Sequence, residues 1–140
     1  MHRTLVICKP DAVERGLVGA IVARLEQKGL AIAALELRTI DESTASRHYA
    51  EHEGKPFYGD LIEFITGGPS VLMVAEGPDD TWSIVRTLMG PTNPATAPPG
   101  TIRGDFGTVL TGNLVHGSDS NESAAREISI FFPSLSGETS

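Results

Sequence analysis

The chain has 140 residues, a formal net charge of −7 at pH 7, 40% hydrophobic residues and one cysteine. Its length is typical of one domain with a packed core, and its acidic balance argues against a nucleic-acid or anionic-membrane surface. The longest apolar run, residues 30–35, is far too short to cross a membrane, and the N-terminus lacks the pattern of a signal peptide. A lone cysteine excludes an internal disulfide. We therefore expect a single cytoplasmic domain over residues 1–140, with no membrane association and no specific nucleic-acid partner.

Apolar spacing and turn residues predict the following elements in chain order. They are a strand over 3–8, a helix over 17–28, a strand over 30–40, short helices over 43–52 and 57–66, a strand over 70–76, a helix over 82–89, a short strand over 113–116 and a last helix from about residue 120. Residues 133–140 are expected to form a flexible polar tail. This order predicts an α/β (α+β) fold, a ferredoxin-like βαββαβ sandwich with helices packed on a four-stranded antiparallel sheet.

One long segment, residues 90–112, has no periodicity and contains five glycines and four prolines. A structureless loop of more than about 12–15 residues is uncommon in a compact domain and is usually functional or disordered. Thr92, Arg103 and Asp105 lie there among residues that restrict or free the backbone, a pattern too specific for a linker. We therefore favour an ordered binding loop over a disordered one.

The segment Asn113–Ser120 joins the last predicted strand to the last helix and carries His116. An imidazole at a strand end, beside the N-terminus of a helix, is well placed for chemistry on an anion. Glu127 lies on the following helix and reaches the imidazole if that helix folds back over the strand. A carboxylate there would hold one histidine tautomer and raise its basicity. A histidine satisfied within the core is the alternative interpretation.

Other patterns limit the kind of site. The chain has no Gly-x4-Gly-Lys-Ser/Thr loop, no Gly-x-Gly-x-x-Gly after a strand and no Gly-x-Ser-x-Gly. His48 and His52 have a spacing that suits a metal on a helix, but their charged surroundings favour a solvated helix face. Residues 56–140 hold ten acidic residues and only three basic ones, which are Arg86, Arg103 and Arg126. The rarity of positive charge in this half means that each of the three arginines needs its own explanation.

Taken together, the motifs resemble those of the nucleoside diphosphate kinase family. The resemblance extends from residue 4 to about residue 132 and rests on Lys-Pro-Asp at 9–11, Arg-Gly-Leu-Val-Gly at 15–19, His-Tyr at 48–49, Lys-Pro-Phe at 55–57, Thr-Asn-Pro at 92–94, Pro-Gly-Thr-Ile-Arg-Gly-Asp-Phe at 99–106 and Asn-Leu-Val-His-Gly-Ser-Asp-Ser at 113–120. Several independent motifs in the family's order argue against a chance match. Gly112 departs from the pattern, because many members have arginine there, but no matched catalytic residue is replaced.

The resemblance implies a phosphotransferase that moves the γ-phosphate of ATP or another nucleoside triphosphate to a nucleoside diphosphate in two half-reactions. It implies that His116 is the nucleophile and becomes phosphorylated, that Glu127 and Ser118 orient and tune its imidazole, and that Lys9 grips phosphate. Mg²⁺ is the implied cofactor, held mainly by the nucleotide phosphates. Asp119 would support the water shell of this ion or cap the last helix.

The resemblance also implies a set of nucleotide-binding residues, namely Lys9, Tyr49, Phe57, Leu61, Arg86, Thr92, Arg103, Leu110 and Asn113. Phe57 matches the position on which the base stacks, and stacking tolerates any base because every base has a π-face. Arg126 is expected to be a surface residue. Members of the family are homo-oligomers, either hexamers or tetramers, and the sequence does not distinguish the two.

Two other functions fit the predicted fold. The first is a ferredoxin-like nucleotide-binding module such as an RNA-recognition domain, which stacks bases on aromatic residues of its central strands. The predicted strands 3–8 and 70–76 contain no aromatic residue, and the net charge has the wrong sign. The second is a phosphohistidine relay protein that passes its phosphate to a protein partner. The implied nucleotide-binding set argues against that role as the main one.

Overall fold

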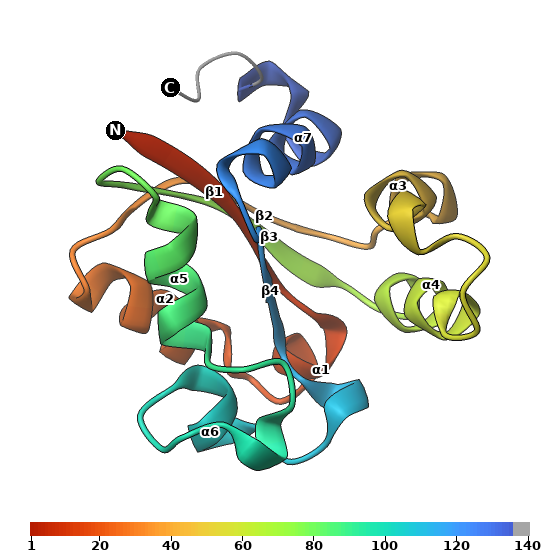
Figure 1. Ribbon diagram of the computed structural model, residues 1–140, viewed down its shortest axis with the longest axis horizontal. Helices are drawn as coiled ribbons and strands as arrows, with labels where there is room; N and C mark the ends of the chain where they lie inside the picture. The colour runs from red at the N-terminus through yellow and green to blue at the C-terminus, as the bar shows by residue number, and fades with distance from the viewer. Residues whose placement is uncertain (136–140) are drawn as a thin grey trace.

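The computed structural model describes residues 1–135, with Thr111 described by its backbone alone. Its centre is a four-stranded antiparallel sheet in the order β2-β3-β1-β4 (Figure 1). The strands are β1 (His2–Cys8), β2 (Ala31–Arg38), β3 (Ser70–Gly77) and β4 (Val115–Gly117). Helical connections follow β1 and β3, so the topology is ferredoxin-like βαββαβ and the predicted fold is confirmed.

Helices cover both faces of the sheet (Figure 1). The crossover helices α2 (Val18–Gln27) and α5 (Thr81–Met89) pack on one face, together with the short helices α1 (Pro10–Glu14) and α6 (Ile102–Phe106). The helices α3 (Glu42–His48), α4 (Tyr58–Thr66) and α7 (Asn121–Phe131) pack on the other face. Single-turn 3₁₀ helices are η1 (Ala50–His52), η2 (Pro94–Thr96), η3 (Leu110–Gly112) and η4 (Pro133–Leu135).

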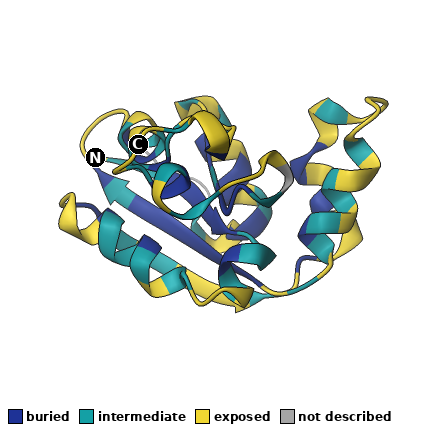
Figure 2. Ribbon diagram, turned by 90° about the horizontal axis from the view of Figure 1, so that it is seen from below, coloured by how far each residue is buried: buried dark blue, intermediate teal, exposed yellow. Residues whose placement is uncertain are grey.

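Side-chain alternation along β1 divides the interior into two cores, one on each face of the sheet. Val6 and Cys8 point toward α2 and α5, whereas Leu5 and Ile7 point toward α7, α3 and α4. Figure 2 shows the buried strands between helices whose outer faces are exposed. Burying one such aliphatic side chain contributes roughly 1.5–3 kcal/mol. The two cores hold α2, near the start of the chain, and α7, near its end, on opposite faces of β1.

The segment 90–112 is ordered, as the favoured interpretation of its sequence predicted. It contains η2, α6 and η3, and Thr101 caps α6 by accepting a hydrogen bond from the Gly104 amide at 3.0 Å. Arg24 of α2 ties the segment down, because its guanidinium donates to the Gly100 carbonyl at 3.0 Å and to the Asp105 carboxylate at 2.7 Å. The short helices were not predicted because they are held by these capping and cross-chain contacts rather than by an apolar stripe.

Some boundaries differ from the prediction. Pro10 was expected only to end β1, but it begins α1, where its fixed φ suits the first helical position. The predicted helix over 43–52 is two elements, because α3 ends at His48 and His52 lies in η1. Of the predicted tail, residues 136–140 lie outside the described residues, whereas Leu135 packs on the core beneath α7. Among residues 1–135, no helix has the length and apolar character of a membrane span.

Candidate active site

Strand β4 presents His116 to the face of the sheet that α7 and α3 cover. His116 lies opposite Ile7 of β1, which belongs to the core beneath α7. Because cross-strand partners point to the same face, the imidazole enters the space between the sheet and these helices. The next residue, Gly117, faces α5, where an added Cβ would lie 2.7 Å from the Met89 sulfur. A larger residue beside His116 would therefore have to displace the Met89 side chain, so glycine suits the close packing of α5 against β4.

A tight turn before β4 sets the direction of the strand. Leu114 has a φ of 71°, and the Val115 amide donates to the Asn113 carbonyl at 2.8 Å, which is the hydrogen bond of a γ-turn. A left-handed φ at a residue other than glycine costs on the order of 1–3 kcal/mol. The Asp11 carboxylate holds it by accepting from the Leu114 amide at 3.1 Å, and the Lys9 amide donates to the Leu114 carbonyl at 2.9 Å. The turn thus fixes β4 against the end of β1.

The predicted contact between Glu127 and His116 is present. His116 Nε2 lies 2.8 Å from Glu127 Oε1, and the Ser118 hydroxyl donates to the same oxygen at 2.8 Å. The Ser118 hydroxyl also accepts from the Leu5 amide at 3.3 Å. Burial alone would raise the pKa of Glu127, but the hydrogen bond from His116 and the charge of that ring outweigh it and hold the pKa below its ordinary value. An ionised carboxylate only accepts, so Nε2 carries a proton, and in the neutral ring Nδ1 bears the lone pair.

The prediction that His48 lies on a solvated helix face is wrong. His48 is 4% exposed, and its ring lies edge-on to that of His116, with ring centroids 4.7 Å apart. Burial, and next the charge of His116, lower the pKa of His48 to about 3, so the ring is neutral. The sequence carried a signal for this position, because His48 follows Ala45 by three residues and lies on the same helix face.

A cleft of about 930 Å³ lies beside the end of β1 and is bordered by α1, α4 and the segment 90–112. It is lined by six of the nine predicted nucleotide-binding residues, namely Lys9, Phe57, Leu61, Thr92, Leu110 and Asn113. Tyr49, Arg86 and Arg103 lie outside this lining. Tyr49 is instead buried, and burial followed by the charge of Glu127 raises the pKa of its phenol to about 12, so the hydroxyl keeps its proton.

Two apolar side chains line the cleft from different elements. Phe57 stands at the start of α4 and is 45% exposed, and Leu110 stands in η3 and is 56% exposed. Exposed large apolar residues beside a cleft are a common feature of ligand sites. Phe57 and Leu110 are therefore candidates to hold a planar group between them.

Three cations gather around β4. Lys9 donates to the Asn113 side chain at 2.8 Å, Arg86 donates to the Gly117 carbonyl at 2.9 Å, and Arg103 donates to the Val115 carbonyl at 2.7 Å. Burial, and then repulsion by Arg103, lower the pKa of Lys9 to about 8. Burial, and then repulsion by Arg86, lower the pKa of Arg103 to about 10.

These three cations form no ion pair in the described part of the chain, although Asp11 attracts Lys9 from a greater distance. Within residues 1–135, no carboxylate oxygen lies within 4.0 Å of the charged nitrogens of Lys9, Arg86 or Arg103. Like charges held together in a partly buried site favour an anion that neutralises them. The region around β4 therefore has the electrostatics of an anion-binding site.

Arg103 has a structural task that the sequence did not reveal. Its guanidinium donates to three main-chain carbonyls, those of Asn113 at 3.2 Å, Gly90 at 2.8 Å and Val115 at 2.7 Å, and the residue is 4% exposed. It joins both ends of the segment 90–112 to β4. A guanidinium has five N–H groups, so hydrogens remain for a further acceptor.

The helix that carries Glu127 is capped by Ser120, not by Asp119. The Ser120 hydroxyl accepts from the Ser123 amide at 2.9 Å, whereas Asp119 is exposed, so the capping alternative for Asp119 is wrong. Arg126, expected at the surface, is 41% exposed at its side chain and donates to the Arg47 carbonyl at 3.3 Å. Ser120 and Arg126 thus fix α7 at its start and against α3.

Comparison with known proteins decides the family. The family model described as nucleoside diphosphate kinase matches residues 2–136. The chain belongs to the nucleoside diphosphate kinase family. A nucleoside diphosphate kinase of Mycobacterium marinum is 62% identical over 134 residues, which are 95% of this chain and 98% of the relative.

Solved structures of nucleoside diphosphate kinases have the same fold. The halophilic nucleoside diphosphate kinase of Halobacterium salinarum in complex with CDP is 53% identical, with a TM-score of 0.87 over 93% of this chain and 86% of that one. A nucleoside diphosphate kinase family protein of Babesia bovis is 45% identical, with a TM-score of 0.93 over 97% of this chain and 91% of that one. These likenesses confirm the family resemblance inferred from the motifs.

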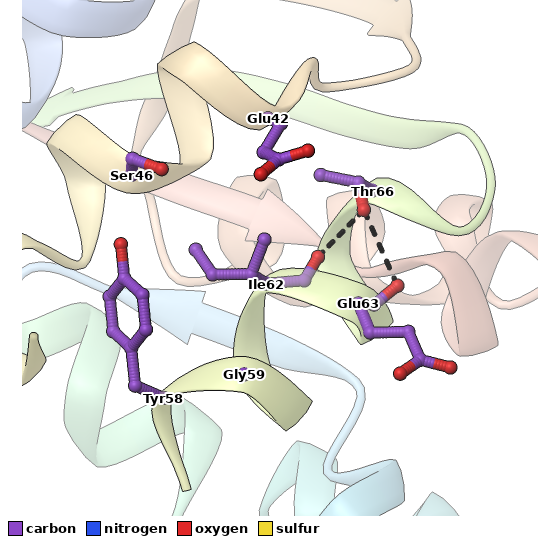
Figure 3. Close-up of a pocket in the computed structure, with 7 residues that line it drawn as sticks. All are labelled: Glu42, Ser46, Tyr58, Gly59, Ile62, Glu63 and Thr66. Atoms are coloured by element: carbon purple, nitrogen blue, oxygen red, sulfur yellow. Dashed lines mark hydrogen bonds between the residues drawn. The ribbon is translucent and has the colours of Figure 1, made fainter. Parts of the chain in front are cut away.

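A second cavity of about 430 Å³ lies between α3 and α4 (Figure 3). It is lined by Glu42, Ser46, Tyr58, Gly59, Ile62, Glu63 and Thr66, and the Thr66 hydroxyl donates to the Ile62 carbonyl at 2.7 Å. No lysine, arginine or histidine lines it, and none of the residues predicted for the nucleoside diphosphate kinase site does. The cleft beside β1 also has carboxylates in its lining, but it includes Lys9 and six of the predicted nucleotide-binding residues, so it is the better candidate for the nucleotide.

Proposed function

We propose that this chain transfers the γ-phosphate of a nucleoside triphosphate, usually ATP, to a nucleoside diphosphate through a phosphohistidine on His116. In the first half-reaction the Nδ1 lone pair attacks the γ-phosphorus, a P–N bond forms, and the bond to the bridging oxygen breaks. The electron pair of that bond leaves with the nucleoside diphosphate. In the second half-reaction the terminal oxygen of another diphosphate attacks the phosphorus and the imidazole leaves.

The observation that carries this proposal is the hydrogen bond between His116 and Glu127. It occupies Nε2 with a proton and leaves the Nδ1 lone pair for nucleophilic attack. As Nδ1 bonds to phosphorus, positive charge develops on the ring, and the buried carboxylate stabilises that charge. Ser118 supports the same carboxylate oxygen, because it donates to it at 2.8 Å. We assign Glu127 and Ser118 the task of orienting and tuning the imidazole.

The cations around β4 support phosphoryl transfer. Phosphoryl transfer depends mainly on positioning and charge neutralisation, because charge is spread over the phosphate oxygens. We propose that Lys9, Arg86 and Arg103 bind these oxygens, with Tyr49 and Thr92 as hydroxyl partners. Tyr49 keeps its proton because its pKa is about 12, so it can donate a hydrogen bond.

The cleft supports a nucleotide whose base is recognised by its flat faces. We propose that the base lies between Phe57, the N-cap of α4, and Leu110 on η3, with Leu61 beneath it and Asn113 near the sugar hydroxyls. Stacking on an aromatic ring is worth about 1–3 kcal/mol and does not depend on the identity of the base. The Halobacterium salinarum relative binds CDP, which supports nucleoside diphosphates as ligands. An activity confined to one nucleobase would count against this assignment.

We propose Mg²⁺ as the cofactor. Mg²⁺ prefers oxygen ligands, keeps several waters and is bound through substrate phosphates in many enzymes. The donor set fits this, because Asp119 is an exposed carboxylate three residues after His116 and can hold the water shell of an ion that arrives with the nucleotide. When bound, Mg²⁺ neutralises charge on the phosphate oxygens.

We also propose that the chain is a cytoplasmic homo-oligomer whose copies meet at β2. This strand lies at one edge of the sheet, and its Leu35 and Leu37 are 52% and 62% exposed. An edge strand with exposed apolar residues offers unpaired main-chain groups to a second copy. Light scattering after chromatography would distinguish a tetramer from a hexamer. A monomer at all protein concentrations would refute this part.

The decisive test of the function is incubation with Mg-ATP followed by intact mass spectrometry. We expect one acid-labile phosphate per chain, located on His116, and its removal by any nucleoside diphosphate. Proteolytic mapping identifies the modified residue, and His116→Ala is the matched control. A stable phosphoserine, or labelling that persists in His116→Ala, would refute the mechanism. Labelling that only a protein acceptor removes would favour a phosphohistidine relay instead.

A further inference from the structure

His48 is the buried histidine that the proposed reaction does not use. It is the last residue of α3, is 4% exposed and packs edge-on against His116. Its Nδ1 is buried and has no hydrogen-bond partner. Buried polar atoms are nearly always paired, so an unpaired ring nitrogen beside a reactive histidine needs a physical reason.

His48, His116 and Glu127 converge on one point. Each offers one ligand atom, and these atoms all lie within 4.8 Å of one another. Among the described residues, this is the only group of three or more histidine, cysteine or carboxylate side chains with that geometry. A tetrahedral ion with bonds of about 2.0–2.1 Å holds its ligands about 3.3 Å apart. The longest separation must therefore shorten by about 1.5 Å, which is within reach of small side-chain rotations.

We propose that His48, His116 and Glu127 form a site for a borderline transition-metal cation, with Zn²⁺ as the probe. Two imidazole nitrogens and one carboxylate oxygen are the ligand set of many zinc enzymes, with a fourth position open to water. Mg²⁺ prefers six oxygen ligands and does not suit this set. The site therefore differs in chemistry and in ligands from the Mg²⁺ that arrives with the nucleotide.

The positive charges around the site oppose a cation, so a metal bound there must gain its affinity from bonds to the imidazole nitrogens. Glu127 is the one carboxylate of the triad, and it accepts the Ser118 hydroxyl and lies 3.8 Å from the Arg126 guanidinium. Lys9 and Arg126 both act electrostatically on His48. A cation that is held mainly by charge, such as Mg²⁺, binds weakly beside these positive side chains. Zn²⁺ and Cu²⁺ bind more tightly because their bonds to imidazole nitrogen have covalent character.

The metal would regulate the same histidine that carries the phosphate, and this consequence rests on the proposed function. Binding at Nε2 of His116 displaces the proton now donated to Glu127, and in the neutral ring that proton moves to Nδ1. The lone pair needed for attack on phosphorus is then blocked. We therefore expect a metal bound at Nε2 to slow the phosphorylation of His116.

Metal binding is tested without nucleotide. Metal-free protein is titrated with Zn²⁺ in competition with a chromophoric chelator, and Co²⁺ is used in parallel, because its visible absorption reports four-coordinate nitrogen and oxygen ligation. We expect one ion per chain and at least tenfold weaker binding in His48→Gln. His52→Gln is the matched control, since it makes the same substitution at a partly exposed histidine four residues away that lies outside the triad, and it should bind within twofold of the original chain. His48→Phe keeps a ring in the core and should also lose the site if His48→Gln folds poorly.

Inhibition is tested by adding Zn²⁺ before Mg-ATP and comparing each variant with its own zinc-free rate. The His48 variants should resist inhibition at least tenfold better, whereas chelation of ATP by Zn²⁺ would affect all variants equally. Equal zinc affinity with and without His48 would overturn the metal site and leave the kinase function standing. If zinc binding depends on His48 but His116 is never phosphorylated, the metal site stands and the proposed kinase function is refuted.

Discussion

Replacing Glu127 by glutamine tests how the buried carboxylate acts on His116. The substitution keeps the size of the side chain and an oxygen that can accept the same hydrogen bonds, but it removes the negative charge. In the structure one carboxylate oxygen accepts from His116 Nε2 and from the Ser118 hydroxyl, each at 2.8 Å. Both bonds can therefore persist in Glu127→Gln, and only their charge assistance is lost.

The expected loss follows from the strength of those bonds. A hydrogen bond to a charged group is worth about 1.5–3 kcal/mol, against about 0.5–1.5 kcal/mol for a neutral one. This difference between a charged and a neutral acceptor matters most when the ring becomes positive during attack on phosphorus. For the bonds from His116 and from Ser118 together, it amounts to roughly 1.5–3 kcal/mol. Because about 1.4 kcal/mol corresponds to a factor of ten, phosphorylation should slow by about 10- to 100-fold.

The assay is rapid-quench phosphorylation of the chain by excess Mg-ATP, followed by intact mass spectrometry. Ser118→Ala is the control, because it removes one donor from the same carboxylate oxygen and leaves the charge in place. Ser118 donates to the carboxylate both before and during the attack on phosphorus, so its loss affects the two states similarly, and this variant should slow by less than tenfold. Thermal melting of both variants separates a catalytic effect from a loss of folded protein.

Two results would refute this reasoning. A Glu127→Gln chain that phosphorylates within twofold of the original rate would show that the carboxylate charge does not act on the reacting ring. A Ser118→Ala chain slower than Glu127→Gln, with unchanged melting temperature, would show that the hydroxyl acts on substrate directly rather than through Glu127.

Three further predictions concern other parts of the molecule. The pKa of Lys9 is about 8, so affinity for ADP measured by calorimetry should fall by about tenfold between pH 7 and pH 9 as its charge is lost, and not in Lys9→Arg. Cys8 is fully buried with a pKa of about 12, so a thiol reagent should modify it only as fast as the chain unfolds; rapid modification in native buffer contradicts this. An added Cβ at Gly104 would lie 1.9 Å from the Pro98 carbonyl oxygen, so Gly104→Ala should lower the melting temperature by at least about 5 °C, and an unchanged value would contradict that packing.

Much of the fold could be predicted from the sequence, because local patterns of apolar and turn residues determine its strands and helices. Strand and helix periodicity predicted four strands and their crossovers, and the antiparallel ferredoxin-like sheet is confirmed. The position of His116 at the end of a short strand, followed by a helix that carries Glu127, also follows from local patterns. The helical spacing from Ser120 to Glu127 returns the carboxylate toward β4 once the helix packs on the sheet.

Only the tertiary structure decided the surroundings of that histidine. His48 is 68 residues from His116 in the sequence, and its burial depends on α3 packing against the sheet face that His116 enters. Arg103 reads as a loop charge, yet it joins three main-chain carbonyls around β4. Such contacts depend on which distant elements pack together. The local pattern of residues along the chain does not show that packing. The sequence therefore identified His116, Glu127 and the three cations, whereas the position of His48 and the main-chain contacts of Arg103 were decided by packing.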